Sequence, residues 1–210
     1  MIKLIIADDH PIVREGLKQI IADFSHFTVS DEAGNGPELL DKVRKEDFDV
    51  IILDLKMPGM DGLDVLKQLK IEKPRIPVII LTVHPEAQYA LRILRAGASG
   101  YLTKESVSDE LITAIRKVHR GGKYISPSLA EKIAFALDTD SEKILHETLS
   151  DREYQVMYMI ASGKTVTEIA EELNLSVKTI STYRARILEK MNMKTNAELT
   201  RYAFQNNLID

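Results

Sequence analysis

The length and composition of the chain limit what it can be. Its 210 residues suit one large domain or two small ones. A content of 44% hydrophobic and 29% charged residues, with a mean hydropathy of -0.13, indicates a globular rather than a disordered protein. The absence of cysteine excludes disulfides, thiolate nucleophiles and zinc-thiolate or iron-sulfur sites. Because two aspartates interrupt the apolar opening, we expect neither a signal peptide nor a membrane span, and a cytoplasmic location.

Charge is distributed unevenly along the chain. The 28 basic and 32 acidic residues give a net charge of -4. Within 177–201, however, six Lys and Arg residues stand against two acids. Such a basic stripe suits a phosphate-backbone partner, and a solvated helix face would explain it equally well.

Two kinds of segment alternate in residues 1–120. Short runs rich in Val, Ile and Leu have the length of strands buried on both faces, and longer stretches between them have helical spacing. The predicted strands are 3–7, 28–33, 50–53, 78–81 and a segment around 101–102. The predicted helices are 11–24, 37–45, 62–70, 86–96 and 107–120, the last with Ser106 as its cap. Five such repeats predict a flavodoxin-like, doubly wound parallel α/β sheet.

The pattern changes after Gly121 and Gly122. One further helix is predicted over 128–137, and the polar stretch 138–147 is interpreted as a linker. Four short helices are predicted beyond it, because capping residues recur at helical intervals. These caps are Ser150, Thr165, Ser176 and Thr195. We therefore expect a first domain over 1–120, a helix and linker over 121–148, and a small all-α domain over 149–210.

Polar residues stand where the apolar runs of the first domain end. Asp8 and Asp9 follow the first run, Asp54 the third, Thr82 the fourth, and Lys104 lies just past the fifth. Each acid alone could be a helix cap or a solvated loop residue. In a doubly wound sheet, however, the carboxyl ends of the strands converge on one crevice, so we expect one shared pocket. Three close carboxylates need a proton or a cation, and an all-oxygen site suits Mg²⁺.

Phosphoryl transfer to a carboxylate is the chemistry that this pocket favours. Asp54 would be the nucleophile, with the cation, Lys104 and Thr82 stabilising the equatorial oxygens of the transferred group. Other phosphate-binding and nucleophilic motifs are missing or incomplete. The chain has no GxxxxGK[ST] loop and no GxSxG elbow, and its one partial GxGxxG, which begins at Gly34, lacks the third glycine.

The pocket residues also carry a family resemblance. They are Asp8, Asp9, Asp54 within VIILDLKMPGMDG (50–62), Thr82, Tyr101 and Lys104. In this order and spacing they resemble the receiver domain of two-component response regulators. The resemblance implies that Asp54 is the phosphoacceptor and that Lys104 pairs with the phosphoryl group. It places Mg²⁺ on Asp9, Asp54 and the backbone carbonyl of Lys56, with Asp8 as an outer-shell partner.

Two further roles follow from this resemblance. Thr82 and Tyr101 resemble a switch pair, in which the hydroxyl moves toward the phosphoryl group and the ring turns inward. Such a movement would repack the face formed by the fourth helix, the fifth strand and the fifth helix. His10 stands beside the acid pair, and its role is open between tuning of the pocket and a capping or surface position.

Residues 165–191 have the pattern of a helix-turn-helix. Apolar residues recur at helical spacing over 166–173 and again over 177–191, with a three-residue break between them. Asn174 is the expected left-handed residue of this break. The face opposite the second apolar stripe would enter the major groove of DNA. It holds Lys178, Thr182, Ala185, Arg186 and Glu189.

The second domain resembles a known DNA-binding family as well. The block from LSDRE (149–153) through IAEELNLSVKTISTYRARILEKM (169–191) is similar to the LuxR-type domain, and its pairing with a receiver resembles the NarL/FixJ subfamily. The resemblance implies base contacts from Ser181, Thr182 and Ala185, phosphate contacts from Lys178, Thr179, Arg184 and Arg186, and a dimerising helix over 195–205. Ala185 is short, which leaves contact with a thymine methyl. Arg184 lies near the apolar stripe, where its stem could instead cover the core.

The predicted function is that of a response regulator transcription factor. Phosphorylation of Asp54 by a sensor histidine kinase would control homodimerisation and binding to double-stranded DNA, while contact with RNA polymerase is left open. We expect no membrane partner, and no enzyme activity beyond weak self-phosphorylation or self-dephosphorylation. A haloacid-dehalogenase-like phosphatase would need an acid where Lys56 stands. A pure interaction module would need a degenerate pocket, and all six pocket residues are present.

Overall fold

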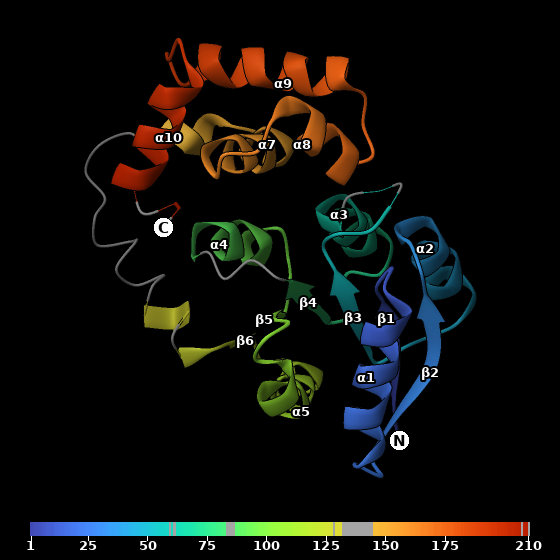
Figure 1. Cartoon of the computed structure of the whole chain (residues 1–210). Helices are drawn as coiled ribbons and strands as arrows, with labels where there is room; N and C mark the ends of the chain where they lie inside the picture. The colour runs from blue at the N-terminus through green and yellow to red at the C-terminus, as the bar shows by residue number, and fades with distance from the viewer. Residues whose placement is uncertain are drawn as a thin grey trace. The chain divides into compact units, whose positions relative to one another are not determined.

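The computed structural model divides the chain into two compact units, Met1–Ala136 and Leu137–Asp210. It describes residues 1–58, 60, 62–82, 87–127, 129–131, 145–206 and 208–209 (Figure 1). Most of the helix predicted over 128–137 lies outside these residues. In the part of the chain described, no helix has both the length and the apolarity needed to cross a membrane.

Unit 1 contains a six-stranded sheet in which every neighbouring pair is parallel. The strand order is β2-β1-β3-β4-β5-β6. The strands are β1 (Ile2–Ala7), β2 (Phe27–Ala33), β3 (Val50–Asp54), β4 (Val78–Thr82), β5 (Gly100–Thr103) and β6 (Tyr124–Ile125). The predicted doubly wound α/β fold is confirmed. The sixth strand was not predicted, because two residues are too few to show a strand period.

Helices cover both faces of this sheet, α1 and α5 on one and α2, α3 and α4 on the other (Figure 1). They are α1 (Pro11–Ala22), α2 (Gly36–Lys45), α3 (Gly62–Glu72), α4 (Ala87–Arg95) and α5 (Val107–His119). Leu4 and Ile6 of β1 pack in one core cluster with Leu17 of α1 and Ile115 of α5. Since alternate strand residues point to opposite faces, Ile5 is left for the other layer, where it is equally buried. Two covered faces explain why the strand runs are continuously apolar.

One predicted helix cap in unit 1 is wrong. Ser106 precedes α5, but its backbone is already in the right-handed helical region and its side chain makes no capping hydrogen bond. Instead its hydroxyl accepts a hydrogen bond from Thr103 Oγ1 at 3.1 Å, and its amide donates to the same oxygen at 3.3 Å. Thr103 therefore engages the hydroxyl that was predicted to cap the helix.

The described part of unit 2, residues 145–206 and 208–209, has helices as its only regular elements, as predicted. It contains a short 3₁₀ helix, η1 (Leu145–Thr148), followed by α7 (Asp151–Ala161), α8 (Val166–Glu172), α9 (Val177–Lys190) and α10 (Asn196–Gln205). Ser150 and Thr165 form complete capping boxes at the starts of α7 and α8. At the start of α10 only half of a capping box is present. The Thr195 hydroxyl accepts the Glu198 amide, but the Glu198 carboxylate accepts the Lys194 amide rather than the Thr195 amide.

The turn between α8 and α9 has the predicted conformation. Asn174 has a φ of 52°, in the left-handed region that asparagine tolerates. Ser176 then caps α9, since its hydroxyl accepts the Thr179 amide at 3.0 Å. Ile169 of α8 and Ile180 and Ile187 of α9 are fully buried. The turn therefore holds the two helices against one core and leaves the opposite face of α9 to solvent.

Candidate functional site

Four neighbouring strands bring the predicted pocket residues of unit 1 together. Asp8 follows β1, Asp54 ends β3, Thr82 ends β4 and Lys104 follows β5. Asp8, Asp54 and Thr82 are 0%, 2% and 1% exposed. The Lys104 amide donates to the Thr82 carbonyl at 2.7 Å, which attaches the loop after β5 to the end of β4. The convergence expected at the carboxyl edge of the sheet is therefore present.

Lys104 bridges the two buried acids. Its Nζ lies 2.7 Å from Asp8 Oδ2 and 2.7 Å from Asp54 Oδ2. The second oxygens accept backbone amides, Asp54 Oδ1 from Lys56 at 3.2 Å and Asp8 Oδ1 from His10 at 2.8 Å. One ammonium thus serves two carboxylates that are out of contact with water.

The electrostatics of the pocket reflect this shared cation. Burial, and to a smaller extent the charge of Asp8, raise the pKa of Asp54 to about 6, although Lys104 and the Lys56 amide act in the opposite direction. Burial lowers the pKa of Lys104, but its hydrogen bonds to Asp54 and Asp8 outweigh this and leave the pKa above its usual value. Lys104 is therefore charged, and the pocket carries uncompensated negative charge once Asp54 ionises.

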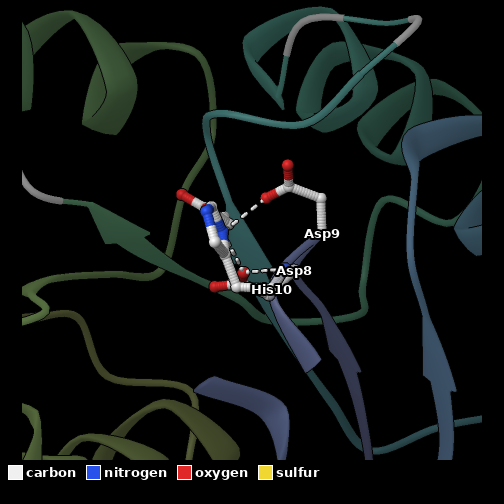
Figure 2. Close-up of side chains that lie close together, drawn as sticks. Asp8, Asp9 and His10 are labelled. Atoms are coloured by element: carbon white, nitrogen blue, oxygen red, sulfur yellow. Dashed lines mark hydrogen bonds and ion pairs between the residues drawn. The ribbon is translucent and has the colours of Figure 1, made fainter. Parts of the chain in front are cut away.

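Asp9 and His10 complete the cluster on its solvent side (Figure 2). Their side chains are 32% and 60% exposed. His10 Nδ1 lies 2.7 Å from Asp9 Oδ1 and 3.1 Å from Asp8 Oδ1. His10 stands at the cap position of α1 without forming a side-chain capping bond. His10 was left open between tuning of the pocket and a capping or surface position. The structure shows an exposed side chain that contacts both acids and does not cap the helix.

The cluster has the composition of a divalent-cation site. One ligand atom each from Asp8, Asp9, His10 and Asp54 can be chosen so that all lie within 4.8 Å of one another. Asp9 Oδ1 is buried and accepts no hydrogen bond with adequate geometry from the described residues. A group of carboxylate oxygens that includes Asp9 Oδ1 suits a hard cation such as Mg²⁺.

Thr82 and Tyr101 lie on neighbouring strands and on the same face of the sheet. Tyr101 pairs with Ile80 in the β4–β5 register, two residues before Thr82. Its ring is buried, with 1% of the residue exposed. The tyrosine therefore has the inward orientation that the resemblance assigns to one state of the switch pair.

The predicted DNA-binding residues of α9 divide by exposure. Lys178, Ser181, Thr182, Ala185 and Arg186 are exposed, whereas Thr179 and Arg184 are partly buried. A shallow hollow of about 290 Å³ lies along this face, lined by Ser176, Lys178, Thr179, Thr182, Tyr183 and Arg186. Tyr183 was missed by the sequence reasoning. Its spacing of four residues from Thr179 and three from Arg186 is the helical signal that would have placed it on this face.

Two of the predicted DNA-binding residues form hydrogen bonds within unit 2. Arg184 Nε donates to Asn196 Oδ1 at 2.6 Å, so the arginine connects α9 to the first residue of α10. Thr182 Oγ1 donates to the Lys178 carbonyl at 2.9 Å and remains exposed. The hydroxyl of Thr182 can still accept a hydrogen bond, whereas Arg184 has a structural partner to give up before it contacts phosphate.

Comparison with known protein families identifies the class of the chain. Residues 4–116 match the response regulator receiver domain, and residues 147–203 match the luxR family of bacterial regulatory proteins. The receiver match alone covers more than half of the 210 residues. The chain therefore belongs to the response regulators and carries a LuxR-type DNA-binding domain, as the sequence motifs predict.

Full-length relatives support the same classification. The chain is 36% identical to the response regulator UvrY of Escherichia coli (strain K12), over 100% of this chain and 97% of the relative. It is 39% identical to the response regulator GacA of Pseudomonas protegens, over 100% and 99%. RcsB of Salmonella enterica serovar Typhimurium, bound to promoter P1flhDC with the phosphomimetic BeF3⁻, matches with a TM-score of 0.63 and 29% identity, over 96% of this chain and 97% of RcsB.

Proposed function

We propose that this response regulator accepts a phosphoryl group on Asp54 from a partner sensor histidine kinase, and that the modification controls pairing of two chains and binding of double-stranded DNA. The observation that carries the proposal is the Lys104 ammonium, 2.7 Å from both Asp8 and Asp54 and shared between them. A carboxylate that is buried, only partly neutralised and adjacent to a fixed cation is suited to accept a group that brings its own negative charge and requires a counter-ion.

The pocket residues have distinct roles in this step. A carboxylate oxygen of Asp54 attacks phosphorus, the bond from phosphorus to the donor nitrogen breaks, and the donor imidazole leaves with its electron pair. Lys104 remains paired with Asp8 and turns its contact from Asp54 to a phosphoryl oxygen. The Thr82 hydroxyl donates to another phosphoryl oxygen, and Tyr101 on the neighbouring strand responds to its movement.

Mg²⁺ is the cation that we assign to the pocket. Asp9, Asp54 and the backbone carbonyl of Lys56 would hold it, with Asp8 as the outer-shell partner. When bound, the ion supplies positive charge to the acids and to the transferred oxygens. Asp9 Oδ1, a buried oxygen that forms no hydrogen bond with the described residues and has His10 Nδ1 2.7 Å away as an ion-pair partner, lies among the acids and supports this assignment. We propose no enzymatic turnover beyond slow self-phosphorylation and self-dephosphorylation.

The division of labour along the chain follows from the two units. We assign residues 1–120 to the receiver, 121–148 to a helix and linker, and 149–210 to the DNA-binding domain. The family matches over 4–116 and 147–203 support these limits. So does the separation of the chain into compact units at residues 136 and 137.

We assign DNA recognition to α9. Ser181, Thr182 and Ala185 are proposed to reach base edges, and Lys178, Thr179 and Arg186 to bind phosphates. Arg184 would join the phosphate contacts only by leaving Asn196. The exposure of five of the seven predicted residues supports this assignment. The RcsB–promoter complex is a precedent in a protein of similar fold.

Labelling tests the phosphoacceptor. The full-length chain is incubated with radiolabelled acetyl phosphate and Mg²⁺, and the label on the protein is measured. Asp54→Asn should abolish labelling, whereas the control Asp64→Asn, which replaces an exposed acid on α3, should label normally. Labelling of Asp54→Asn at the wild-type level would show that another residue is the acceptor.

Selection from a random pool of duplex DNA tests the recognition helix. Thr182→Ala should change the sequences that the phosphorylated chain selects, while Arg186→Ala should weaken binding to all sequences alike and reduce its salt dependence. Thr167→Ala, at an exposed position of α8, is the matched control and should leave both unchanged. An equal, sequence-independent loss from Thr182→Ala and Arg186→Ala would contradict the division of roles.

A further inference from the structure

The sixth strand, β6, lies directly beside the strand that carries Tyr101. It forms one edge of the sheet, next to β5 (Figure 1). Gly121, with a φ of 84°, turns the chain back after α5, in a left-handed conformation that glycine adopts without strain. The Tyr124 amide then donates to the Ser99 carbonyl at 2.8 Å, which aligns β6 with β5. The chain therefore leaves the fifth helix along the strand of the proposed switch.

Tyr124 holds β6 against α5, on one face of the sheet. Its ring belongs to the same core cluster as Val118 of that helix. The phenol donates to Glu110 Oε2 at 3.0 Å, and Lys117 Nζ lies 5.7 Å from the centre of the ring. These side-chain contacts explain how a strand of two residues keeps its place, since its backbone alone can form few hydrogen bonds with β5.

Ile125 is the other residue of β6, and it faces the side of the sheet on which Tyr101 lies. Successive strand residues point to opposite faces, so Ile125 points away from α5. In the β5–β6 register Ile125 pairs with Tyr101, and in the β4–β5 register Tyr101 pairs with Ile80. Tyr101 therefore has β4, the strand that ends in Thr82, on one side and the partly buried Ile125 on the other.

This position of Ile125 limits where the tyrosine ring can go. The ring of Tyr101 is buried in the inward orientation. To turn away from Thr82 it has to move toward β6. A tyrosine side chain is longer than the spacing of about 4.8 Å between neighbouring strands, so an outward ring and the Ile125 side chain compete for the same space. In a sheet that ended at β5, that space would be open to solvent.

We propose that Ile125 is a positioning residue of the switch, which keeps the Tyr101 ring inward by filling the space that the outward ring needs. The inference rests on the proposed function, in which Tyr101 responds to phosphorylation of Asp54. It adds the residue that favours, before phosphorylation, the orientation expected after it. β6 lies within the segment 121–148 that we assign to the helix and linker, so the orientation of Tyr101 is coupled to the chain that leads toward unit 2.

The experiment follows the Tyr101 ring directly in the full-length chain. All seven tyrosines are replaced by 3-fluorotyrosine, and Tyr101→Phe identifies the ¹⁹F signal of Tyr101. The change of that signal between H₂O and D₂O measures the exposure of the ring. In wild type we expect a buried ring with or without Mg²⁺ and BeF3⁻. In Ile125→Ala without BeF3⁻, the ratio of inward to outward ring should fall by about fivefold or more, and BeF3⁻ should restore it.

Two further variants separate positioning from a loss of structure. Ile71→Ala, at a 76% exposed position of α3, is the matched control and should leave the Tyr101 signal unchanged. Hydrogen exchange at the Tyr124 amide shows whether β6 stays paired in Ile125→Ala. If β6 detaches there, Ile125→Val decides the test, because it removes one methyl group and keeps the branched side chain. It should shift the signal in the same direction by a smaller amount with the Tyr124 amide still protected.

The outcomes separate this inference from the proposed function. A Tyr101 signal that is the same in wild type, Ile125→Ala and Ile125→Val would overturn the inference. An exposed ring in wild type without BeF3⁻ would overturn it as well, because Ile125 would then not hold the ring inward. A chain labelled on Asp54 whose Tyr101 signal ignores Ile125 would keep the function and lose the inference. A chain without that label, in which Ile125→Ala releases the ring, would do the reverse.

Discussion

Asp54 in unit 1 and Glu153 in unit 2 are carboxylates of similar burial, 2% and 4% exposed, whose pKa values shift in opposite directions. Burial raises the pKa of Asp54 to about 6, because its cation, Lys104, is shared with Asp8. Burial also acts to raise the pKa of Glu153, but Lys190 and the amide and hydroxyl of Ser150 outweigh it and leave the pKa below its usual value. The pKa of each carboxyl therefore depends both on how deeply it is desolvated and on how many donors it has, and Asp54 is the more deeply desolvated of the two.

This difference separates a reactive site from a supporting one. Glu153 accepts the Ser150 amide at 2.8 Å, the Ser150 hydroxyl at 2.8 Å and Lys190 Nζ at 2.6 Å, so its charge is fully used in holding α7 and α9 together. Asp54 has one shared ammonium and one long amide contact of 3.2 Å. The carboxylate proposed to accept a phosphoryl group is therefore the one whose negative charge the fold neutralises only in part.

The largest expected effect is in the supporting site. Glu153→Ala should lower the free energy of unfolding of unit 2 by about 3 kcal/mol, because three hydrogen bonds of roughly 1 kcal/mol each are lost. Hydrogen exchange of the α7 and α9 amides in the full chain measures this. Glu168→Ala removes the equivalent residue of an exposed capping box and should cost less. Equal losses would mean that burial of Glu153 contributes nothing.

A gain of stability is expected in the reactive site. Asp54→Asn should raise the free energy of unfolding of unit 1 by about 2 kcal/mol at pH 7 without Mg²⁺, because the ionised buried acid is removed. The folded pKa of about 6 exceeds the usual 3.8, so the folded state holds the proton more tightly and wild type loses stability as the pH rises from 4 to 6. The advantage of the variant should vanish near pH 4.

Chemical denaturation across this pH range, followed by hydrogen exchange of the β3 amides, checks the sign. Asp64→Asn, on the exposed face of α3, should show no such pH dependence. Glu153 behaves oppositely, since its lowered pKa contributes stability at neutral pH that is lost as the pH falls below its usual 4.5. If Asp54→Asn is less stable than wild type at pH 7, the ionised Asp54 carboxylate does not destabilise the folded receiver.

The smallest of these effects concerns the start of α9. Ser176→Ala removes the hydroxyl that accepts the Thr179 amide at 3.0 Å and should cost about 1 kcal/mol in local stability. Faster hydrogen exchange in the first turn of α9 is the measurement. Ser181→Ala, in the exposed middle of the same helix, is the control. If both variants exchange alike, the cap does not stabilise the recognition helix.

The two sites differ in how far the sequence predicts them. The caps Ser150, Thr165 and Ser176 and the left-handed Asn174 act within a few residues, and the structure has each of them as expected. Ser106 shows where a local signal fails, because a hydroxyl has several partners within reach and Thr103 is the one it meets. Tyr183 shows that a full helical wheel would have recovered one missed residue.

Sequence by itself determined the fold class, the helix starts of unit 2 and the identity of the pocket residues, because strand and helix periods and capping bonds are short-range. Tertiary structure decided the chemistry. Lys104 contacts Asp8 across 96 positions, whereas His10 contacts Asp8 and Asp9 as their neighbour in the sequence. The pKa of Asp54 depends on which oxygens share the ammonium, and electrostatic energies depend on distances of a few ångströms that no sequence period encodes.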